Sequence, residues 1–352
     1  MQHPRLHLGL LGFDAPAQAR VVAWLQANAA SAAGHSEDCD QHPVWEVVDF
    51  READALLICG AGVMAGGDKQ LQFHASLSQA YFEAPYSQAL HPIGVDLVNI
   101  KQPFALSDTA HLQALNVDIT NCAVFDLDQP LLMQQTLQTF EAVLRPLRTL
   151  FALASELHER RNELDADRTF HLERNGILDA VVDPPNRRVL VRAGARPIDI
   201  TTDAWSRRPK SANYAPGHFL ECSMDELAWV LGLYSQQHAA PKRYKSKRIY
   251  VRHSPQVRPS LIYARHIALL ERLYQGGATL TELAQAFPDT AHLLERDLCA
   301  LYNVRAITTT APQGSAAGMS SLPQLFGNSR PPSSLRSDKR FSTISADLQP
   351  LL

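Results

Sequence analysis

The chain has 352 residues, 45% of them hydrophobic and 20% charged, and its formal net charge is -3. This composition is typical of a soluble globular protein, and the length predicts two or three domains. No apolar run approaches the roughly 20 residues that cross a bilayer, and the N-terminus has no signal-peptide pattern. We therefore expect a cytoplasmic protein without a membrane partner.

The sequence contains no recognisable catalytic or metal-binding pattern. Its five cysteines are far apart and form neither a C-x-x-C pair nor a zinc-binding spacing, so we expect reduced thiols. The fourteen histidines are scattered, and none belongs to an H-E-x-x-H motif. No G-x-S-x-G or Walker motif occurs. We therefore expect no catalytic residue, no metal and no cofactor.

Residues 1–130 predict an α/β domain with a doubly wound parallel sheet. Five short apolar runs are typical of buried strands, and a helical stretch around Val21 and Leu25 follows the first of them. The runs lie at 6–12, 44–50, 55–59, 92–98 and 122–127.

Residues 131–166 predict a helical linker. Its apolar residues follow a 3-4-3-4-3 spacing, which is typical of a helix that pairs with another helix. They are Leu137, Phe140, Leu144, Leu147, Phe151 and Ala154. Pro146 interrupts this seam, so either the helix kinks or a second helix begins with Pro146 in its first turn. The seam either packs on its own domain or forms a homodimer.

Residues 167–260 predict a basic α+β domain. Runs rich in β-branched residues lie at 168–172, 177–182 and 189–191, and the turn Asp183-Pro-Pro-Asn-Arg joins the last two as a hairpin. A loop containing Trp205 and Pro209 follows. The pattern from Ser223 to Glu226 is a capping box that begins an apolar helix.

Residues 261–310 predict a helix-turn-helix or winged-helix-like unit. Gly276-Gly277 ends the first helix, a capping box at 279–282 begins the second, and Asp289 can cap the third. A strand-like run at 306–310 completes the parts of such a unit. From 311 to 352 Ser, Pro and Gly dominate, which predicts a disordered tail.

The charges are separated along the chain. Residues 1–140 hold 15 Asp and Glu against 5 Lys and Arg, whereas residues 187–270 hold 15 Lys and Arg against 5 Asp and Glu. Self-repulsion makes such clustering costly unless a polyanion, an acidic partner or the acidic half of the chain offsets it. The cations at 242–252 are interleaved with Tyr244 and Tyr250, whose rings can stack on a base.

We expect these cations to form an anion-binding surface, although they could equally be a solvated edge strand protected against strand addition. The expected contacts are Lys242, Arg243, Lys245, Lys247, Arg248 and Arg252, joined by Arg187 and Arg188 from the hairpin. The third helix of the predicted winged helix is a poor reader of bases, because Glu295 and Asp297 accompany its cations and would repel phosphates.

The acidic first domain resembles the receiver domain of bacterial response regulators in size, strand count and acidic balance. That family has an acidic pair after its first strand, a phosphorylated Asp after its third and a Lys after its fifth, and the carboxylates hold Mg²⁺. Here Asp14 follows the first strand, and Gly60 stands where the acceptor should be. The run Lys101-Gln-Pro-Phe is similar to the family's Lys-Pro-Phe turn, with one residue inserted. The resemblance covers residues 1–140 and implies a pseudo-receiver, unable to take a phosphoryl group.

The glycine-rich loop from Gly60 to Gly67 is the remaining motif. Glycines after a strand can admit a pyrophosphate to the start of a helix, but the spacing departs from G-x-G-x-x-G, and a flexible loop is the simpler interpretation. We therefore expect a non-catalytic signalling protein, in which a pseudo-receiver is coupled to a basic module that binds a protein partner or an anionic nucleotide messenger. The alternatives are a DNA-binding transcriptional regulator and a nucleotide-using enzyme.

Overall fold

The computed structural model describes residues 3–32, 43–65, 71–74, 92–95, 102–114, 122–165, 167–214, 216–236 and 240–311. Met1–Ala311 forms one compact unit. The predicted disordered tail, apart from Ala311, lies outside the described residues. None of the described helices combines the length and apolar composition that a membrane crossing needs.

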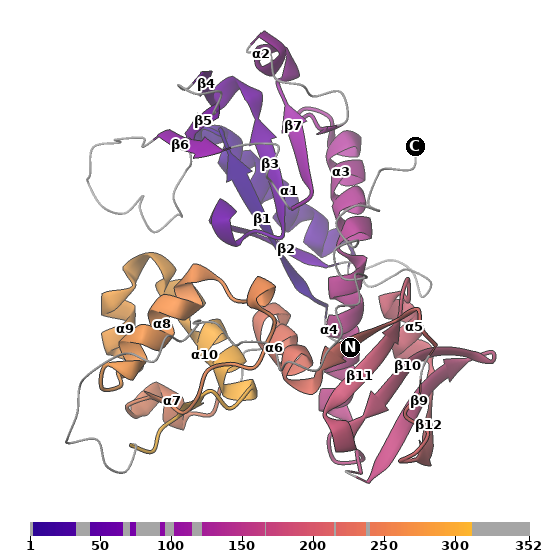
Figure 1. The fold of residues 1–352 in the computed structure, drawn as a ribbon. Helices are drawn as coiled ribbons and strands as arrows, with labels where there is room; N and C mark the ends of the chain where they lie inside the picture. The colour runs from indigo at the N-terminus through magenta and orange to yellow at the C-terminus, as the bar shows by residue number, and fades with distance from the viewer. Residues whose placement is uncertain are drawn as a thin grey trace, which may run out of the picture. The chain divides into compact units, whose positions relative to one another are not determined.

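The N-terminal part of the chain is built on a parallel sheet of five strands in the order β2-β1-β3-β7-β8. This is the 2-1-3-4-5 order of flavodoxin-like sheets. The strands are β1 (Arg5–Leu11), β2 (Val44–Val48), β3 (Ala55–Cys59), β7 (Phe104–Ser107) and β8 (Ala123–Val124). The helices of this part are α1 (Ala15–Ala32), α2 (Thr109–Ala114) and α3 (Pro130–Val143). Apolar residues of α1 and α3 pack on the same face of the sheet, beside Leu8, Leu57 and Ala105. Figure 1 shows the ribbon of this part, with α1 and α3 beside the strands of the sheet.

The sequence prediction placed the fourth parallel strand wrongly. Pro92–Val95 forms β6, which pairs antiparallel with β5 (Leu71–His74), and β5 pairs with β4 (Val63–Ala65) in a separate three-stranded sheet. The fourth parallel strand is Phe104–Ser107 instead. Both segments are short apolar runs, so hydrophobicity alone does not decide which of them joins the sheet.

The connection between β2 and β3 crosses β1 in only six residues, through the 3₁₀ turn Phe50–Glu52. The stagger of the strands permits this, because Val48 and Ala55 pair with Gly9 and Leu8, which are adjacent in β1. A Cβ on Gly9 would lie 2.8 Å from the Cα of Phe50. The crossing therefore requires glycine at this position of β1.

Two helices occupy the predicted helical linker, and they explain its interrupted seam. α3 ends at Val143, and α4 (Arg145–Glu159) begins with Pro146 in its first turn, as one of the two sequence alternatives required. Leu137 and Phe140 pack on the parallel sheet, whereas Phe151 and Ala154 belong to two other cores of the chain. These apolar residues of the seam are therefore used in packing within the chain.

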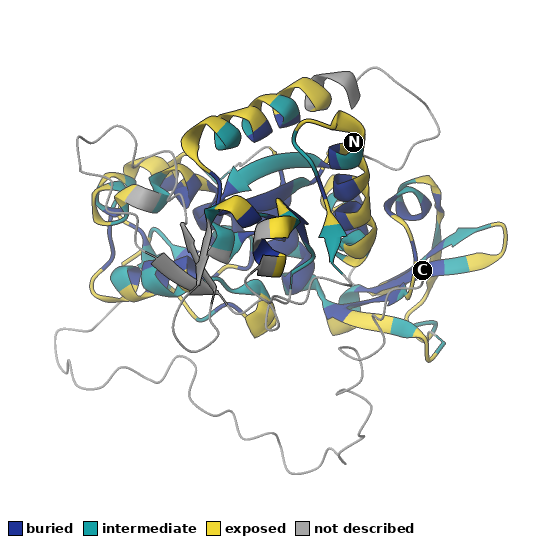
Figure 2. Cartoon of the chain, turned by 90° about the horizontal axis from the view of Figure 1, so that it is seen from above, coloured by how far each residue is buried: buried dark blue, intermediate teal, exposed yellow. Residues whose placement is uncertain are grey.

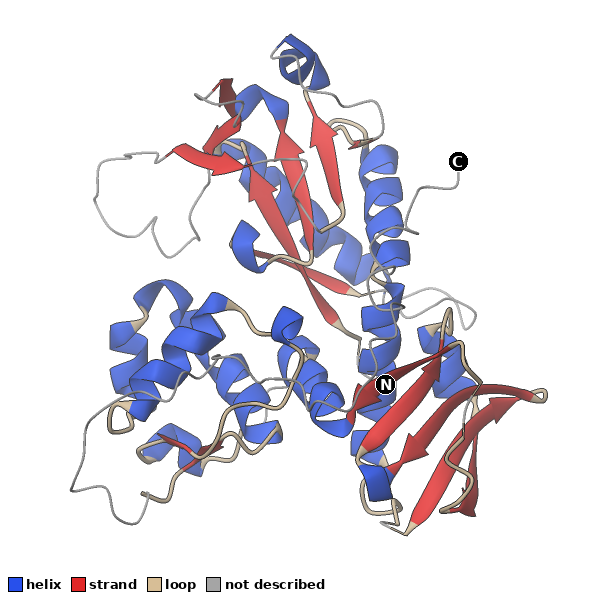
Figure 3. Cartoon of the chain, in the orientation of Figure 1, coloured by secondary structure: helices blue, strands red, loops and turns tan. Residues whose placement is uncertain are grey.

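The central part of the chain is a five-stranded antiparallel sheet in the order β12-β9-β10-β11-β13. Its strands are β9 (Arg168–Arg174), β10 (Ile177–Asp183), β11 (Arg188–Arg192), β12 (Ala204–Pro209) and β13 (Phe219–Ser223). The predicted hairpin is confirmed as β10–β11, whereas the predicted loop around Trp205 is the edge strand β12. The helices α5 (Pro197–Thr202) and α6 (Met224–Tyr234) complete this part (Figure 3).

The C-terminal part consists of short helices and a two-stranded sheet. The elements are α7 (Arg243–Ser246), β14 (Tyr250–Val251), α8 (Ala264–Tyr274), α9 (Leu280–Ala286), α10 (Leu294–Asn303) and β15 (Ile307–Thr308). β14 pairs antiparallel with β15, and Ile249 bridges to Ala278. The capping boxes at Ser223 and Thr279 are present as predicted. Asp289 lies within a 3₁₀ segment, and the third helix begins later, at Leu294.

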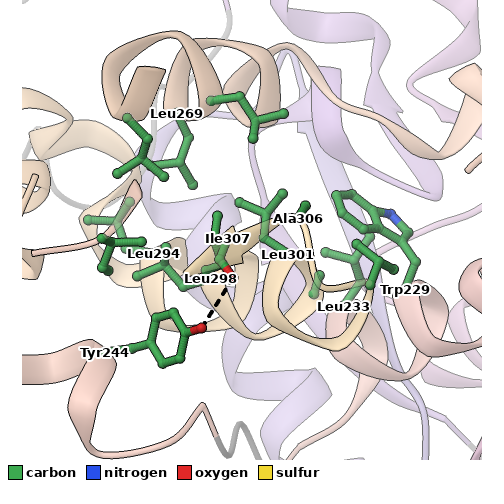
Figure 4. Close-up of a cluster of buried hydrophobic side chains, with 14 of the residues drawn as sticks. Trp229, Leu233, Tyr244, Leu269, Leu294, Leu298, Leu301, Ala306 and Ile307 are labelled. Carbon is green, nitrogen blue, oxygen red and sulfur yellow. Dashed lines mark hydrogen bonds between the residues drawn. The ribbon is translucent and has the colours of Figure 1, made fainter. Parts of the chain in front are cut away.

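One apolar core joins these helices to α6. It includes Trp229, Leu233, Leu269, Leu298 and Leu301, which Figure 4 shows facing one another. Figure 2 shows how buried residues gather in the strands and on the inner sides of the helices. α6 also contributes Leu227 to the core of the antiparallel sheet, so this helix packs against both the C-terminal helices and that sheet.

Candidate functional site

The basic segment, which we define as residues 242–252, lies on α7, on β14 and in the loops around them. Its six expected anion contacts are all exposed: Lys242, Arg243, Lys245, Lys247, Arg248 and Arg252. Tyr244, in contrast, is buried, with its ring edge-on to Tyr302 and its hydroxyl donating to the carbonyl of Ile307 at 3.2 Å. Tyr244 therefore anchors the segment to the core and has no free face on which a base could stack.

Two of the six cations are neutralised by glutamates of neighbouring helices. Lys245 Nζ lies 2.8 Å from Glu295 of α10, and Arg248 lies 2.7 Å from Glu282 of α9. For the other four, Lys242, Arg243, Lys247 and Arg252, no ion pair to a carboxylate is seen in the described part of the chain. These four side chains carry the surplus positive charge of the segment.

The two hairpin arginines are engaged elsewhere. Arg188 pairs with the fully buried Asp183 at 3.0 Å, and a hydrogen bond from Asn213 at 3.2 Å helps to hold the same carboxylate oxygen. Arg187, in left-handed backbone conformation, lies 2.7 Å from Asp225. Arg187 lies in the turn between β10 and β11, and Arg188 begins β11, whereas the other six cations belong to the C-terminal part. The structure therefore does not gather all eight in one element.

The third helix of the predicted winged helix is almost entirely covered. Within α10, Glu295 is the one exposed residue. Its Ala300 packs against Gly232 of α6 so closely that a Cβ on Gly232 would lie 2.5 Å from the Cα of Ala300. A helix that reads the major groove must expose side chains to base edges. In this conformation α10 offers the groove an acidic side chain and little else.

A second assembly of functional groups, which the sequence did not predict, lies where β1 and the β2–β3 connection meet α6, α8 and α10. We call it the ionic junction. Its members are His7, Glu46, Glu52, Asp54, Tyr234, Tyr263, Arg265, His266, Arg296 and Asp297. Glu46, Glu52 and Asp54 come from the acidic region 1–140, Arg265 comes from the basic region 187–270, and Arg296 comes from α10.

One chain of contacts in the junction runs from α10 through β1 to α6. Arg296 lies 2.7 Å from Nε2 of His7, and Nδ1 of His7 lies 3.2 Å from Asp54. Because a guanidinium group only donates hydrogen bonds, Nε2 must accept, and the ring proton sits on Nδ1 facing Asp54. Tyr234 donates to the other Asp54 oxygen at 2.8 Å. Burial lowers the pKa of His7, so the ring is neutral at pH 7.

The other chain of contacts is centred on Asp297, which is buried. Arg265 donates to it at 2.8 Å and also forms an ion pair with Glu52. Nε2 of His266 lies 3.2 Å from Asp297, while the backbone N–H of Tyr263 donates to Nδ1 of His266. Burial alone would raise the pKa of Asp297, but His266 and Arg265 outweigh it and hold this pKa below its usual range. Burial also lowers the pKa of His266.

In the junction, carboxylates of the acidic region pair with arginines from later in the chain. Glu52 pairs with Arg265, and Glu46 lies 3.7 Å from Arg296, so first-domain carboxylates neutralise two arginines of the helical part. The only sequence signal was the opposite net charge of the two halves. Nothing in residue spacing links Asp54 to Tyr234, which lie 180 positions apart. Pairing at this separation is decided by tertiary packing.

The carboxyl end of the parallel sheet is where the receiver resemblance places its chemistry. Asp14 accepts a hydrogen bond from the backbone of Ala17 at the start of α1. Cys59 ends β3, and its thiol donates to Asp108 at 3.2 Å. Burial raises the pKa of this thiol. Lys101 lies outside the described residues, and Phe104 of the same run begins β7, the fourth strand, rather than following the fifth.

In the described part of the glycine-rich loop, residues 60–65, the backbone at Gly62 is packed against another loop. A Cβ on Gly62 would lie 2.0 Å from the carbonyl oxygen of Gly12, so the backbones of the two loops touch. Within this loop the strand β4 (Val63–Ala65) follows Gly62 directly, where the dinucleotide-binding arrangement has a helix. Gly66 and Gly67 lie outside the described residues. Across the part of the chain that the structure describes, no group of three His, Cys, Asp or Glu side chains could hold a metal ion.

Comparisons with known proteins returned no match to a protein-family model, to a curated protein or to a solved structure.

Proposed function

We propose that this chain is a non-catalytic regulatory protein whose basic segment binds an anionic ligand of the nucleotide-messenger class. The observation that carries the proposal is the group of four exposed cations on one short stretch of chain, Lys242, Arg243, Lys247 and Arg252, without a carboxylate partner among the described residues. Arginine forks and lysine ammonium groups are the side chains that bind phosphate groups most readily.

The organisation of the chain supports a regulatory role. The strand order of the parallel sheet is that of receiver-like domains, and Gly60 replaces the carboxylate that such a domain would phosphorylate. The helical part has the three helices and the small antiparallel sheet of a winged-helix-like unit. The ionic junction connects the two parts, so a change in one has a direct physical route to the other.

The proposal is tested by removing the four unpaired cations together. The variant carries Lys242→Gln, Arg243→Gln, Lys247→Gln and Arg252→Gln. A cyclic dinucleotide serves as the probe, with binding measured by calorimetry at 50 mM and 200 mM salt. We expect the natural sequence to bind, and the variant to bind at least about tenfold more weakly, because several charge-assisted contacts are lost.

The matched control removes four exposed cations from the antiparallel sheet. It carries Arg187→Gln, Arg207→Gln, Arg208→Gln and Lys210→Gln, so both variants have the same net charge. The control should bind as the natural sequence does. Equal losses in the two variants would mean that net charge, and not the basic segment, attracts the anion. Absence of binding by the natural sequence would remove the proposal.

A DNA-binding regulator is the second candidate, favoured by the winged-helix-like set of elements. With α10 covered, phosphate contacts from the basic segment would supply the affinity, and binding would depend weakly on sequence. Anisotropy with a 20-base-pair duplex at several salt concentrations separates the two candidates. Each phosphate contact steepens the plot of log K against log salt by about 0.9. A flat or absent response at low salt would exclude DNA.

A further inference from the structure

The antiparallel sheet contains a charge cluster that the proposed function does not use. Three aspartates, Asp179 of β10, Asp199 of α5 and Asp203 at the end of α5, lie beneath arginines of β9, β11 and the start of α5. The aspartate side chains are 1%, 4% and 0% exposed. The arginines, Arg174, Arg192 and Arg196, are 35%, 28% and 51% exposed. Three positive groups thus cover three carboxyl groups that solvent does not reach.

The three aspartates differ in the hydrogen bonds and ion pairs that they receive from the arginines. Arg192 donates from Nε to Asp179 at 2.7 Å. Arg196 donates to Asp199 at 2.8 Å, and Arg174 also pairs with Asp199. For Asp203 the one ion pair among the described residues is with Arg174, whose Nε lies 3.6 Å from one carboxyl oxygen. Among the described residues no donor forms a hydrogen bond with either Asp203 oxygen.

The carboxyl group of Asp179 lies within hydrogen-bonding reach of the Asp203 carboxyl group. An ionised carboxylate only accepts hydrogen bonds, so two ionised groups in contact would repel and neither could donate. A proton placed between them removes one negative charge and supplies the missing donor. It also avoids the large cost of an unpaired buried carboxylate.

We propose that Asp203 and Asp179 share one proton, and that this proton controls the closure of α5 on the sheet. While the proton is bound, the carboxyl pair ties the end of α5 to β10. When it leaves, the pair becomes two adjacent negative charges. Arg174 must then move from Asp199 toward Asp203, or the end of α5 must open to water.

The surroundings of Asp203 place its titration near neutral pH. Burial raises the pKa of Asp203, and the charge and hydrogen bond of Asp179 raise it further, to about 7, against the opposing effect of Arg174. Asp199 behaves in the opposite way. Burial would raise the pKa of Asp199, but hydrogen bonds from Arg196 and Arg174 hold it well below its usual range. One aspartate of the cluster is therefore protonated at pH 6 while its neighbour is ionised.

α5 is connected to other elements of the chain, so a change in its position would affect them. Thr149 of α4 donates to the carbonyl of Ala195, just before α5, at 2.7 Å. α4 continues the chain from α3 of the first domain, and β12 follows Asp203 directly. Opening at α5 would therefore loosen both the edge strand and the helix that leads to the parallel sheet.

The experiment compares the natural sequence with Asp203→Asn and with Asp225→Asn as a surface control. An asparagine amide can donate to Asp179 without a proton, so this variant keeps the contact but loses the titration. Urea denaturation at pH 5.5, 7 and 8.5 should show a midpoint that falls with pH for the natural sequence and for the control. The Asp203→Asn midpoint should fall much less across the same range.

A second measurement covers the outcome in which the Asp203→Asn variant does not fold. Carboxyl carbon NMR of the natural protein should show one aspartate titrating between pH 6 and 8, and amide exchange, corrected for pH, should accelerate in α5 over the same range. An Asp203 titration below pH 5, or a pH dependence that persists unchanged in a folded Asp203→Asn variant, would overturn the shared proton.

Discussion

The hydrogen bond between Tyr234 and Asp54 allows a quantitative test of the ionic junction. Tyr234 is 2% exposed, and its hydroxyl donates to a buried carboxylate at 2.8 Å. Hydrogen bonds to charged groups contribute about 1.5–3 kcal/mol. The single change Tyr234→Phe keeps the ring and removes this donor, together with the longer 3.3 Å contact between the hydroxyl groups of Tyr234 and Tyr263. We expect the free energy of unfolding to fall by about 2 kcal/mol.

The carboxylate of Asp54 serves more than one donor. It accepts from Tyr234 and from the backbone N–H of His7 at 2.8 Å, and the His7 ring lies 3.2 Å away. Asp54→Ala leaves these donors buried without an acceptor, and breaking a buried polar network in this way costs about 4 kcal/mol. In that background Tyr234→Phe should cost less than about 0.5 kcal/mol, since the bond no longer exists. The coupling energy is then at least about 1.5 kcal/mol.

The assay is urea denaturation followed by tryptophan fluorescence, because Trp45 of β2 and Trp229 of α6 lie in the two parts that the junction joins. Tyr274→Phe, at a residue that is 48% exposed, is the control and should change the free energy of unfolding by less than about 0.5 kcal/mol. Additive effects of the two junction substitutions would show that Asp54 and Tyr234 do not interact. The account of the junction would then be wrong.

Three further predictions concern the fold. Gly9→Ala should destabilise the chain by about 2 kcal/mol, because its Cβ would overlap the crossing at Phe50, whereas Gly217→Ala, with open space around it, should change stability by less than about 0.5 kcal/mol in the same urea assay. Ser223→Ala removes the side-chain cap of α6 and should cost about 1 kcal/mol by thermal denaturation. The pKa of Asp297 is lower in the folded chain than in the unfolded one, so its contribution is present above the unfolded pKa and lost as the pH falls below it. Asp297→Asn should therefore lower the free energy of unfolding at pH 7. It should also reduce the fall in that free energy between pH 7 and pH 3, and an equal fall in the variant and the natural sequence would contradict this.

Local patterns in the sequence determined most of the element types. The capping boxes at Ser223 and Thr279 begin helices, Gly276 and Gly277 have positive φ where α8 ends, and Pro146 sits in the first turn of α4. Each of these signals acts between residues a few positions apart, through a side chain or a restricted φ. The sequence could therefore show them without knowledge of the rest of the chain.

Tertiary structure alone decided how the charges are used. The excess of positive charge between 187 and 270 was visible in the sequence, but which of its cations remain available depends on where carboxylates such as Glu52, Glu282 and Glu295 lie in space. The same holds for the choice of Phe104–Ser107 over Pro92–Val95 as the fourth parallel strand, and for the contact of Asp203 with Asp179. Electrostatic pairing and sheet registration depend on distances between segments remote in sequence, and these distances exist only after the cores have packed.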